Sequence, residues 1–220
     1  MKTLQAMLAA ATVLAAAGAA QAQVAVGVHA GTAGFGPDVQ VHLNDNFTVR
    51  GAADWMNFDY GRDYNGVHYD GRLKLATGGA FLDWHPWGNA FFLSGGAYFG
   101  DRKIDLSSVP ASNVTIGGVS YTPAQVGRLD GHIKMDSTAP FAGLGFDTNN
   151  RGVTRGFGFK GLLGVAFSGQ PKVDLTSSGG LLSNTVLLEP QLQLEEQRIA
   201  HDARYLQTYP VAQIGVTYHF

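Results

Sequence analysis

The last segment of the chain constrains its fold more than any other feature. From Pro210 to Phe220, apolar and polar residues alternate, and the final residue is aromatic. Successive side chains of a β-strand point to opposite faces, so this segment predicts a strand with one apolar face. The apolar face carries Ala212, Ile214, Val216, Tyr218 and Phe220. Such a face, ending on an aromatic residue, is typical of the closing strand of a membrane β-barrel.

The first residues have the composition of an export signal. Lys2 precedes an apolar, Ala-rich stretch, which ends in the small-x-small sequence Ala20-Gln21-Ala22 that signal peptidase cleaves. We therefore predict a signal peptide over residues 1–22 and a barrel over residues 23–220. A membrane-spanning anchor would need about 20 sustained apolar residues and different flanks. No Cys follows the apolar stretch, which excludes a lipoprotein anchor.

Composition excludes several classes of function. Removal of Lys2 leaves 14 basic and 17 acidic residues, a net charge of −3, so nucleic acid is not an expected partner. The absence of Cys excludes disulfides and thiolate metal sites. A mean hydropathy near zero fits a barrel because lipid-facing and lumen-facing residues alternate along every strand. The 30 glycines, about twice the usual share, suit strands that bend around a narrow barrel.

Seven more segments alternate in polarity and are separated by turn residues. They cover residues 24–32, 37–43, 47–64, 67–84, 90–102, 140–148 and 157–169. With the closing strand they predict an all-β fold, an eight-stranded antiparallel up-and-down transmembrane barrel with long extracellular loops. An even number of strands leaves both termini on the periplasmic side.

The turn dipeptide Asn65-Gly66 sets the register of the third and fourth strands. It suits a two-residue type I′ turn, which would place Asp54 opposite Thr77 and Thr48 opposite Asp83. The apolar residues of the fourth strand, among them Phe81, favour the opposite facing, because a one-residue slip reverses every side chain. We prefer the hairpin register, since it keeps Asp83 out of the lipid.

The connections divide into short and long ones. Short turns are expected on the periplasmic side at residues 44–46, 85–89 and 149–153, and long segments outside at 105–137 and 172–208. The first long segment contains a predicted hairpin around Gly117-Gly118. The second contains a predicted helix from Pro190 to Arg204, whose apolar side we expect to pack on the barrel rim.

The interior of an eight-stranded barrel is just wide enough to be filled by side chains. The predicted inward face carries ionisable residues of both signs: His29, Asp38, His42, Arg50, Asp54, Asp83, Asp147 and Lys160. One interpretation is a network of ion pairs that packs the barrel. The other is a polar path in which Arg50 changes partner between Asp54 and Asp83, and in which glycines leave room beside Lys160.

The sequence contains no complete catalytic or metal-binding pattern. The motifs G-x-S-x-G and H-E-x-x-H are absent, and no His or carboxylate can be placed beside the inward Ser94 or Ser168. A cluster in the third and fourth strands could hold a cation, although solvated loop charges are the commoner explanation: Asp59, Asp63, His68 and Asp70. We predict no catalytic residue, metal or cofactor.

The chain resembles the small eight-stranded outer-membrane proteins, the group that includes outer-membrane proteins A, X and W. Pro140-Phe141-Ala142-Gly143-Leu144-Gly145 and the terminal Tyr218-His219-Phe220 are similar to outer-membrane protein W. The resemblance implies passage of small, often apolar molecules. It also implies contact with outer-membrane lipid and lipopolysaccharide, and a barrel-assembly machinery that reads the terminal aromatics Tyr218 and Phe220.

Three functions stay open at this point, all of them in the cell outer membrane. The first is a narrow channel or a binding barrel for a small solute. The second is a surface or envelope-stabilising barrel with a plugged lumen and ligand-binding outer loops. The third is a lipid-modifying enzyme.

Overall fold

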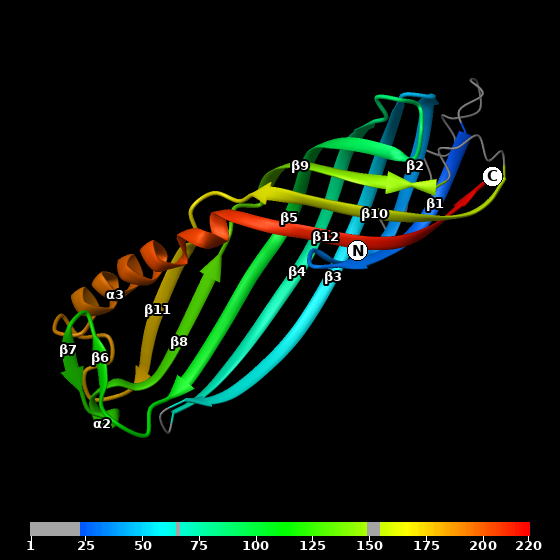
Figure 1. Ribbon diagram of the computed structural model, residues 1–220. Helices are drawn as coiled ribbons and strands as arrows, with labels where there is room; N and C mark the ends of the chain where they lie inside the picture. The colour runs from blue at the N-terminus through cyan, green and yellow to red at the C-terminus, as the bar shows by residue number, and fades with distance from the viewer. Residues whose placement is uncertain (1–22, 65–66, 149–154) are drawn as a thin grey trace.

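Eight antiparallel strands form a closed barrel in the computed structural model, which describes residues 23–64, 67–148 and 155–220 (Figure 1). The strands of the wall are β1 (Gln23–Gly31), β2 (Gly34–Asn44), β3 (Phe47–Tyr64), β4 (Val67–Trp84), β5 (Phe91–Val109), β9 (Thr138–Asp147), β10 (Gly156–Phe167) and β12 (Thr208–His219). Each pairs with the next, and β12 pairs with β1 to close the wall. The predicted fold class is confirmed. The predicted signal peptide, the turn dipeptide Asn65-Gly66 and most of the turn at 149–153 lie outside the described residues.

The two ends of the barrel differ in their connections. At one end β2 joins β3 through Asp45 and Asn46, β4 joins β5 through residues 85–90, and β12 ends. We call this the turn end. At the opposite end, the loop end, β3 meets β4 and the two long segments leave the barrel (Figure 1).

The register predicted for β3 and β4 is confirmed along its whole length. Tyr64 pairs with Val67, Asp54 with Thr77 and Thr48 with Asp83. Asp83 is therefore buried inside the barrel, whereas the neighbouring Trp84 is exposed on the outer surface. The apolar residues that suggested the opposite facing are in the lumen, where Phe81 and Leu75 are buried.

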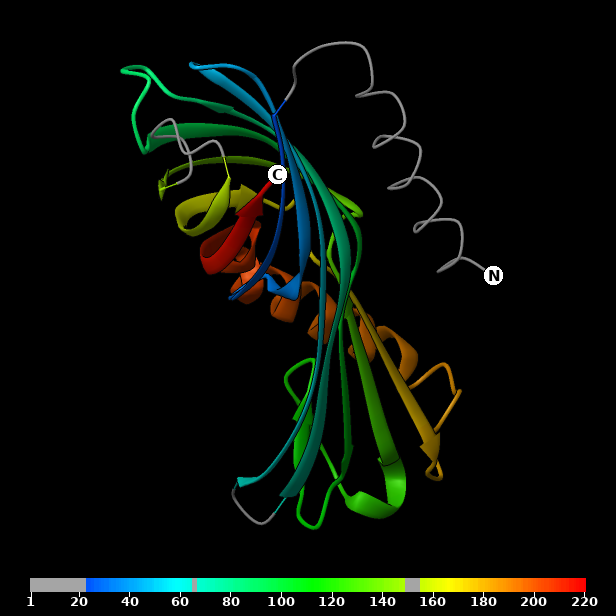
Figure 2. The same ribbon diagram turned by 90° about the vertical axis from the view of Figure 1, so that its right-hand side faces the viewer.

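The long segments contain strands that the sequence did not predict. β8 (Gly127–Lys134) pairs with the last third of β5, and β11 (Lys172–Gly179) pairs with β8. These two strands join the extensions of β3, β4 and β5 in a sheet beyond the loop end, which we call the outer sheet (Figure 2). β5 pairs with β9 as far as Phe99 and with β8 from Lys103 onward, so the sheet forks between these residues. Gly100 lies at the fork with φ 131°, a conformation that other residues rarely adopt.

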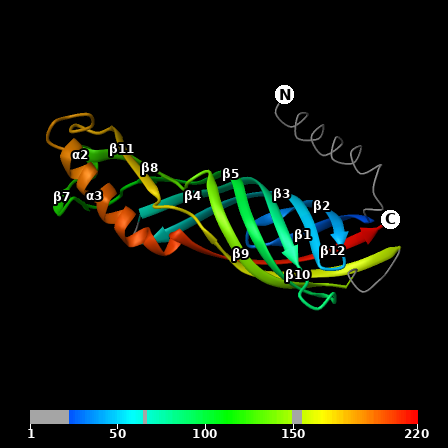
Figure 3. The same cartoon turned by 90° about the horizontal axis from the view of Figure 1, so that it is seen from above.

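Both short elements expected in the long segments are present. The hairpin around Gly117-Gly118 consists of β6 (Val114–Ile116) and β7 (Val119–Tyr121), and the helix is α3 (Glu189–Asp202), followed by the 3₁₀ turn η3 (Ala203–Gln207). The prediction that α3 packs on the barrel rim was wrong. Its buried Leu192 and the preceding Leu188 pack instead with the β6–β7 hairpin and with Val126 of α2 (Pro123–Val126), beside β11 (Figure 3). No helix among the described residues is long and apolar enough to cross a lipid bilayer.

Side chains of the wall sort by polarity between its two faces. The outer face exposes large apolar residues from every strand; Phe159, for example, is 66% exposed. The buried inner face carries charged and amide side chains, among them Asp83, which is 1% exposed. This arrangement is the reverse of that of a soluble barrel, which has its apolar face inside.

Candidate functional site: the lumen and the loop-end pocket

An ionic cluster lies in the lumen near the turn end. Arg50 Nε donates to Asp83 Oδ2 at 3.0 Å, and Lys160 Nζ lies 3.3 Å from the same oxygen. Ser94 Oγ donates to Asp83 Oδ1 at 2.5 Å and accepts a hydrogen bond from Arg50 Nη2. Lys160 Nζ is also 4.0 Å from Asp147 Oδ2. Asp83 contacts both buried cations, and Asp83 and Asp147 together balance their two charges, which makes a buried ion cluster tolerable.

Asp54 belongs to a separate group, which changes one expectation from the sequence. Its Oδ1 lies 2.8 Å from His29 Nε2 and accepts a hydrogen bond from Gln213 Nε2 at 3.1 Å. Arg50 forms its ion pair with Asp83, whereas Asp54 is paired with His29. The polar path predicted from the sequence, in which Arg50 changes partner between Asp54 and Asp83, is therefore not prepared by a shared contact.

The remaining predicted inward residues complete the polar part of the lumen. Asp38 accepts a hydrogen bond from Gln40, and the ring of His42 stacks edge-on against that of His219 at 5.2 Å. A cavity of 10 Å³ lies between Asp38, Arg50 and Lys160, about the volume that one water molecule needs. All eight ionisable residues placed on the inward face by the sequence therefore have their side chains in the lumen.

Aromatic rings fill the lumen above the ionic cluster. Phe81, Tyr98 and Phe141 pack edge to face, with ring centroids 4.9–5.6 Å apart, and Arg50 lies over the Phe81 ring. We call these three rings the aromatic layer. Glycines make room for them: a Cβ on Gly164 would lie 2.5 Å from the Phe141 ring. The room that inner-face glycines were expected to leave beside Lys160 is thus taken up by side chains.

A mainly apolar pocket of 170 Å³ lies on the loop-end side of the aromatic layer. Tyr98 belongs to both the aromatic layer and the pocket wall, and Ala166 and Val211 of the wall pack in the same apolar cluster as the three rings. The other lining residues come from the β1–β2 turn, from β4, β5 and β12, and from the segment that follows β8: Ala33, Leu73, Leu75, Thr77, Arg102, Ile104, Met135 and Tyr209. We call this the loop-end pocket.

Two polar groups of the loop-end pocket are buried without a complete set of partners. Arg102 is 7% exposed and its Nη2 donates to the backbone carbonyl of Asp136, but its Nε has no hydrogen-bond partner in the described part of the chain. Tyr98 is 2% exposed, and among the described residues its hydroxyl has no hydrogen-bond partner. The hydroxyl of Tyr209, in contrast, donates to the carbonyl of Thr32. The sequence placed Tyr98 inward but did not single out Arg102, although it has the same parity as Tyr98 in the fifth strand.

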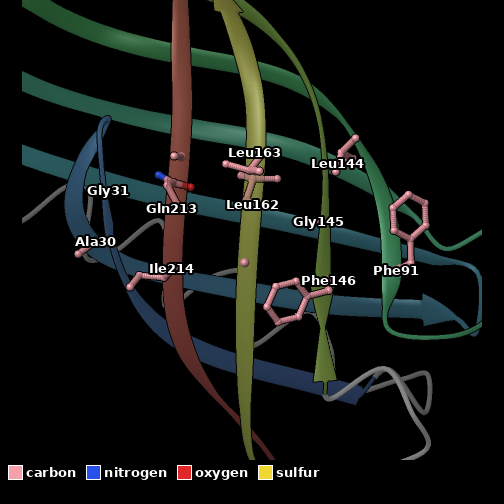
Figure 4. Close-up of a pocket in the computed structure, with 12 residues that line it drawn as sticks. Ala30, Gly31, Phe91, Leu144, Gly145, Phe146, Leu162, Leu163, Gln213 and Ile214 are labelled. Atoms are coloured by element: carbon pink, nitrogen blue, oxygen red, sulfur yellow. The ribbon is translucent and has the colours of Figure 1, made fainter.

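A groove of 650 Å³ lies on the outside of the barrel. It spreads over β1, β12, β10, β9 and β5, where Leu144, Phe146, Leu163 and Ile214 lie beside smaller residues such as Ala30 (Figure 4). The Phe146 ring covers Gly161, where an added Cβ would lie 2.4 Å from it. These side chains belong to the exposed apolar face, so this groove is separate from the lumen.

The outer sheet carries a third, strongly charged hollow of 520 Å³. Within it Arg72 Nε donates to Asp59 at 2.5 Å, which raises the pKa of Arg72. Asp105 accepts hydrogen bonds from His132 and Lys74, and these contacts lower the pKa of its carboxyl. Arg128 lies 3.3 Å from Asp130 in the same hollow.

The cation site considered from the sequence is not assembled among the described residues. Asp59 pairs with Arg72, and the side chains of Asp63 and His68 lie outside the described part. No group of three or more His, Asp or Glu side chains with metal-binding geometry occurs in the described ranges. The hydroxyl of Ser94 is bound within the ionic cluster.

The terminal aromatics lie at the turn end, on the outer face. The Tyr218 ring packs edge to face with both Phe157 and Phe220, at 5.0 and 5.2 Å. Phe220 is exposed, and its backbone N–H donates to the carbonyl of Val24 across the closing seam.

Comparison with solved structures gives four matching chains, two of which are described here. The crystal structure of Acinetobacter baumannii CarO2 aligns with a TM-score of 0.62 at 24% identity, covering 91% of this chain and all of the other. That of Acinetobacter baumannii CarO aligns at 0.60 and 22% identity, covering 90% and 98%. No family model and no curated protein sequence match this chain. The likeness to both structures concerns the fold alone and agrees with the eight-stranded antiparallel barrel.

Proposed function

We propose that this chain is an outer-membrane barrel that binds a small, mostly apolar solute in the loop-end pocket, above a closed lumen. The observation that carries the proposal is the pocket itself. It is enclosed by the barrel wall, lined chiefly by Leu, Ile, Met and Ala side chains, and floored by the aromatic layer. Binding sites for small molecules are typically concave and apolar, with a few polar groups that fix orientation.

The closed lumen favours binding over open conduction. The aromatic layer and the ionic cluster lie one above the other in the lumen. The cavity between the charged side chains has a volume of only 10 Å³, too small for a solute larger than water. Membrane location is supported by the continuous apolar outer face and by the fold. Of the functions expected from the sequence, a barrel that binds a small solute therefore has more support than a narrow channel.

Pocket filling tests the proposal. Leu75 lines the loop-end pocket, and Leu75→Trp places an indole where a solute would lie. Leu82→Trp is the matched control, since Leu82 is exposed on the outer face of the same strand. Titration of the neutral probe hexanamide into protein in lipid nanodiscs, with empty discs as the blank, is expected to show saturable binding. Leu75→Trp should weaken it at least tenfold and Leu82→Trp should not. Equal binding to all three proteins contradicts the proposal.

The charged hollow of the outer sheet supports a second function, recognition at the surface. Its cations Arg72 and Arg128 are more than half exposed and could bind phosphate groups of lipopolysaccharide. Lipopolysaccharide that copurifies with the barrel is measured for the wild type and for the double variant Arg72→Ala, Arg128→Ala. This second function requires a lower content in the variant, and an unchanged content excludes it.

A further inference from the structure

We infer that the solute of the loop-end pocket is a monocarboxylate with a short apolar body, held at its charged end by Arg102 and Tyr98. The inference rests on the proposed function and specifies the chemical class of its ligand. It is carried by the two buried polar atoms of the pocket that have no partner, Arg102 Nε and the Tyr98 hydroxyl.

Arg102 supplies the charge. The residue is 7% exposed, and its Nη2 donates to the backbone carbonyl of Asp136. The Asp136 carboxylate interacts with the guanidinium electrostatically, but among the described residues no carboxylate lies within ion-pair distance of it. A buried cation is costly without a counter-charge, and a buried donor without an acceptor adds to that cost. A ligand carboxylate in the pocket would provide both, because the guanidinium presents several donors in the geometry that a carboxylate accepts.

Tyr98 supplies a second donor on the same strand. Arg102 and Tyr98 are both on the inward side of β5, on either side of Gly100, and both line the pocket. The fork of the sheet fixes this placement: Gly100 N–H donates to the carbonyl of Ser137, and Met135 N–H donates to that of Arg102. The two side chains are therefore held by backbone pairing on both sides of the bend.

The rest of the pocket limits the size and the charge of the ligand. Leu73, Leu75 and Ile104 offer only apolar surface, which suits a hydrocarbon body. An apolar protein cavity of about 150 Å³ accommodates benzene, so 170 Å³ suits a body of about six carbons. Asp54 is buried nearby and interacts electrostatically with Tyr98, which disfavours a second negative charge on the ligand.

Three probes of one length separate charge from apolar fit: hexanoate, hexanamide and hexylammonium. Each is titrated calorimetrically into the full mature protein in lipid nanodiscs, with empty discs as the blank. We expect hexanoate to bind at least tenfold more tightly than hexanamide, because a hydrogen bond to a charged group has roughly that effect. Hexylammonium should bind more weakly than either. Equal affinity of hexanoate and hexanamide, or tighter binding of hexylammonium, overturns the inference.

Variants test the two residues separately. Arg102→Gln should lower hexanoate affinity at least tenfold and leave hexanamide within about twofold. Tyr98→Phe should weaken hexanoate by about fivefold through loss of one hydrogen bond, and it decides the matter if Arg102→Gln does not assemble. Arg198→Gln, at an exposed position of α3, is the control and should leave the affinity for hexanoate unchanged. Full hexanoate affinity in both pocket variants overturns the inference.

The same titrations separate binding in the loop-end pocket from preference for a carboxylate. Binding of hexanamide that Leu75→Trp removes, without any preference for hexanoate, keeps the proposed function and rejects the carboxylate. Absence of binding by all three probes, or binding that Leu75→Trp leaves unchanged, rejects the proposed function itself.

Discussion

A few inward side chains fill the lumen near the turn end. Asp83 is the clearest, because both Arg50 and Lys160 pair with its Oδ2 and Ser94 donates to its other oxygen. The sequence predicted that these side chains share the lumen. It could not predict their pairing, because long flexible side chains reach across strands and their partners depend on neighbours that the register alone does not specify. Asp54, which lies closer to Arg50 in sequence than Asp83 does, pairs with His29 instead.

Loss of the Asp83 charge should destabilise the barrel strongly. Asp83→Asn leaves two buried cations, with Asp147 as the remaining partner of Lys160, and removing one member of a buried ion cluster costs about 3–5 kcal/mol. The measurement is urea unfolding in lipid vesicles, followed by tryptophan fluorescence. Asp101→Asn, at an exposed pair with Lys103, is the control and should cost at most about 1 kcal/mol. Equal stability of the two variants would refute this role of Asp83.

The outer sheet should weaken in acid through Asp105. Hydrogen bonds from His132 and Lys74 lower the pKa of this carboxyl below its value in the unfolded chain, about 3.9. The ionised form therefore stabilises the folded sheet above pH 4, and the contribution is lost as the pH falls through the lowered pKa. Amide hydrogen exchange of β5 and β8 should show less protection at pH 3 than at pH 5. Asp105→Asn should reduce this difference, and an unchanged difference would assign it to other groups.

Elements show where prediction from sequence succeeds and where it fails. The register of β3 and β4 followed from a two-residue turn, because a type I′ hairpin leaves one pairing for every residue. β8 and β11 were missed although β8 does alternate, with Leu129, Gly131 and Ile133 on one side. The other side carries charges at each position, and these residues stood in a segment already assigned to an extracellular loop. A strand in the outer sheet has no lipid to select large apolar side chains, so its pattern is weaker.

The helix α3 should depend on one buried leucine. Leu192 packs with Leu188 and the β6–β7 hairpin, and Leu→Ala at such a site costs about 2–5 kcal/mol. Leu192→Ala should therefore speed hydrogen exchange and proteolysis of residues 172–207 and leave the barrel strands protected. Leu194→Ala is the control, since Leu194 is half exposed on the same helix. Loss of protection in the barrel strands as well would show that the outer elements and the barrel unfold together.

At the scale of the whole molecule, polarity is divided between an apolar outside and a lumen that is polar near the turn end. The two comparison structures have a similar fold. The sequence pattern predicted this fold because alternate residues of a wall strand stay on the same face, as the unbroken pairing of β10 with β12 illustrates. What the pattern could not supply is the fork at Gly100, which turns β5 from β9 to β8 and creates the wall of the loop-end pocket. A change of partner within one strand leaves little trace in its alternation.

A charge on the outer face should impair stability in the membrane. Leu163 lies in the middle of β10 and is 60% exposed in the apolar groove. Leu163→Arg should lower the free energy of unfolding in phospholipid vesicles by about 2–4 kcal/mol, the cost of Arg on the lipid face near the bilayer midplane. Leu194→Arg, on α3, should cost far less. Similar values for both variants would contradict a lipid-facing position for Leu163.

The position of the loop-end pocket above the aromatic layer and the ionic cluster has a consequence for movement of a solute. A solute bound in this pocket, as proposed above, would enter and leave through the loop end. Binding would therefore saturate at one molecule per barrel, whatever the solute gradient across the membrane. Onward delivery to the cell interior would then require a rearrangement of the aromatic layer and the ionic cluster, or a second protein that receives the solute.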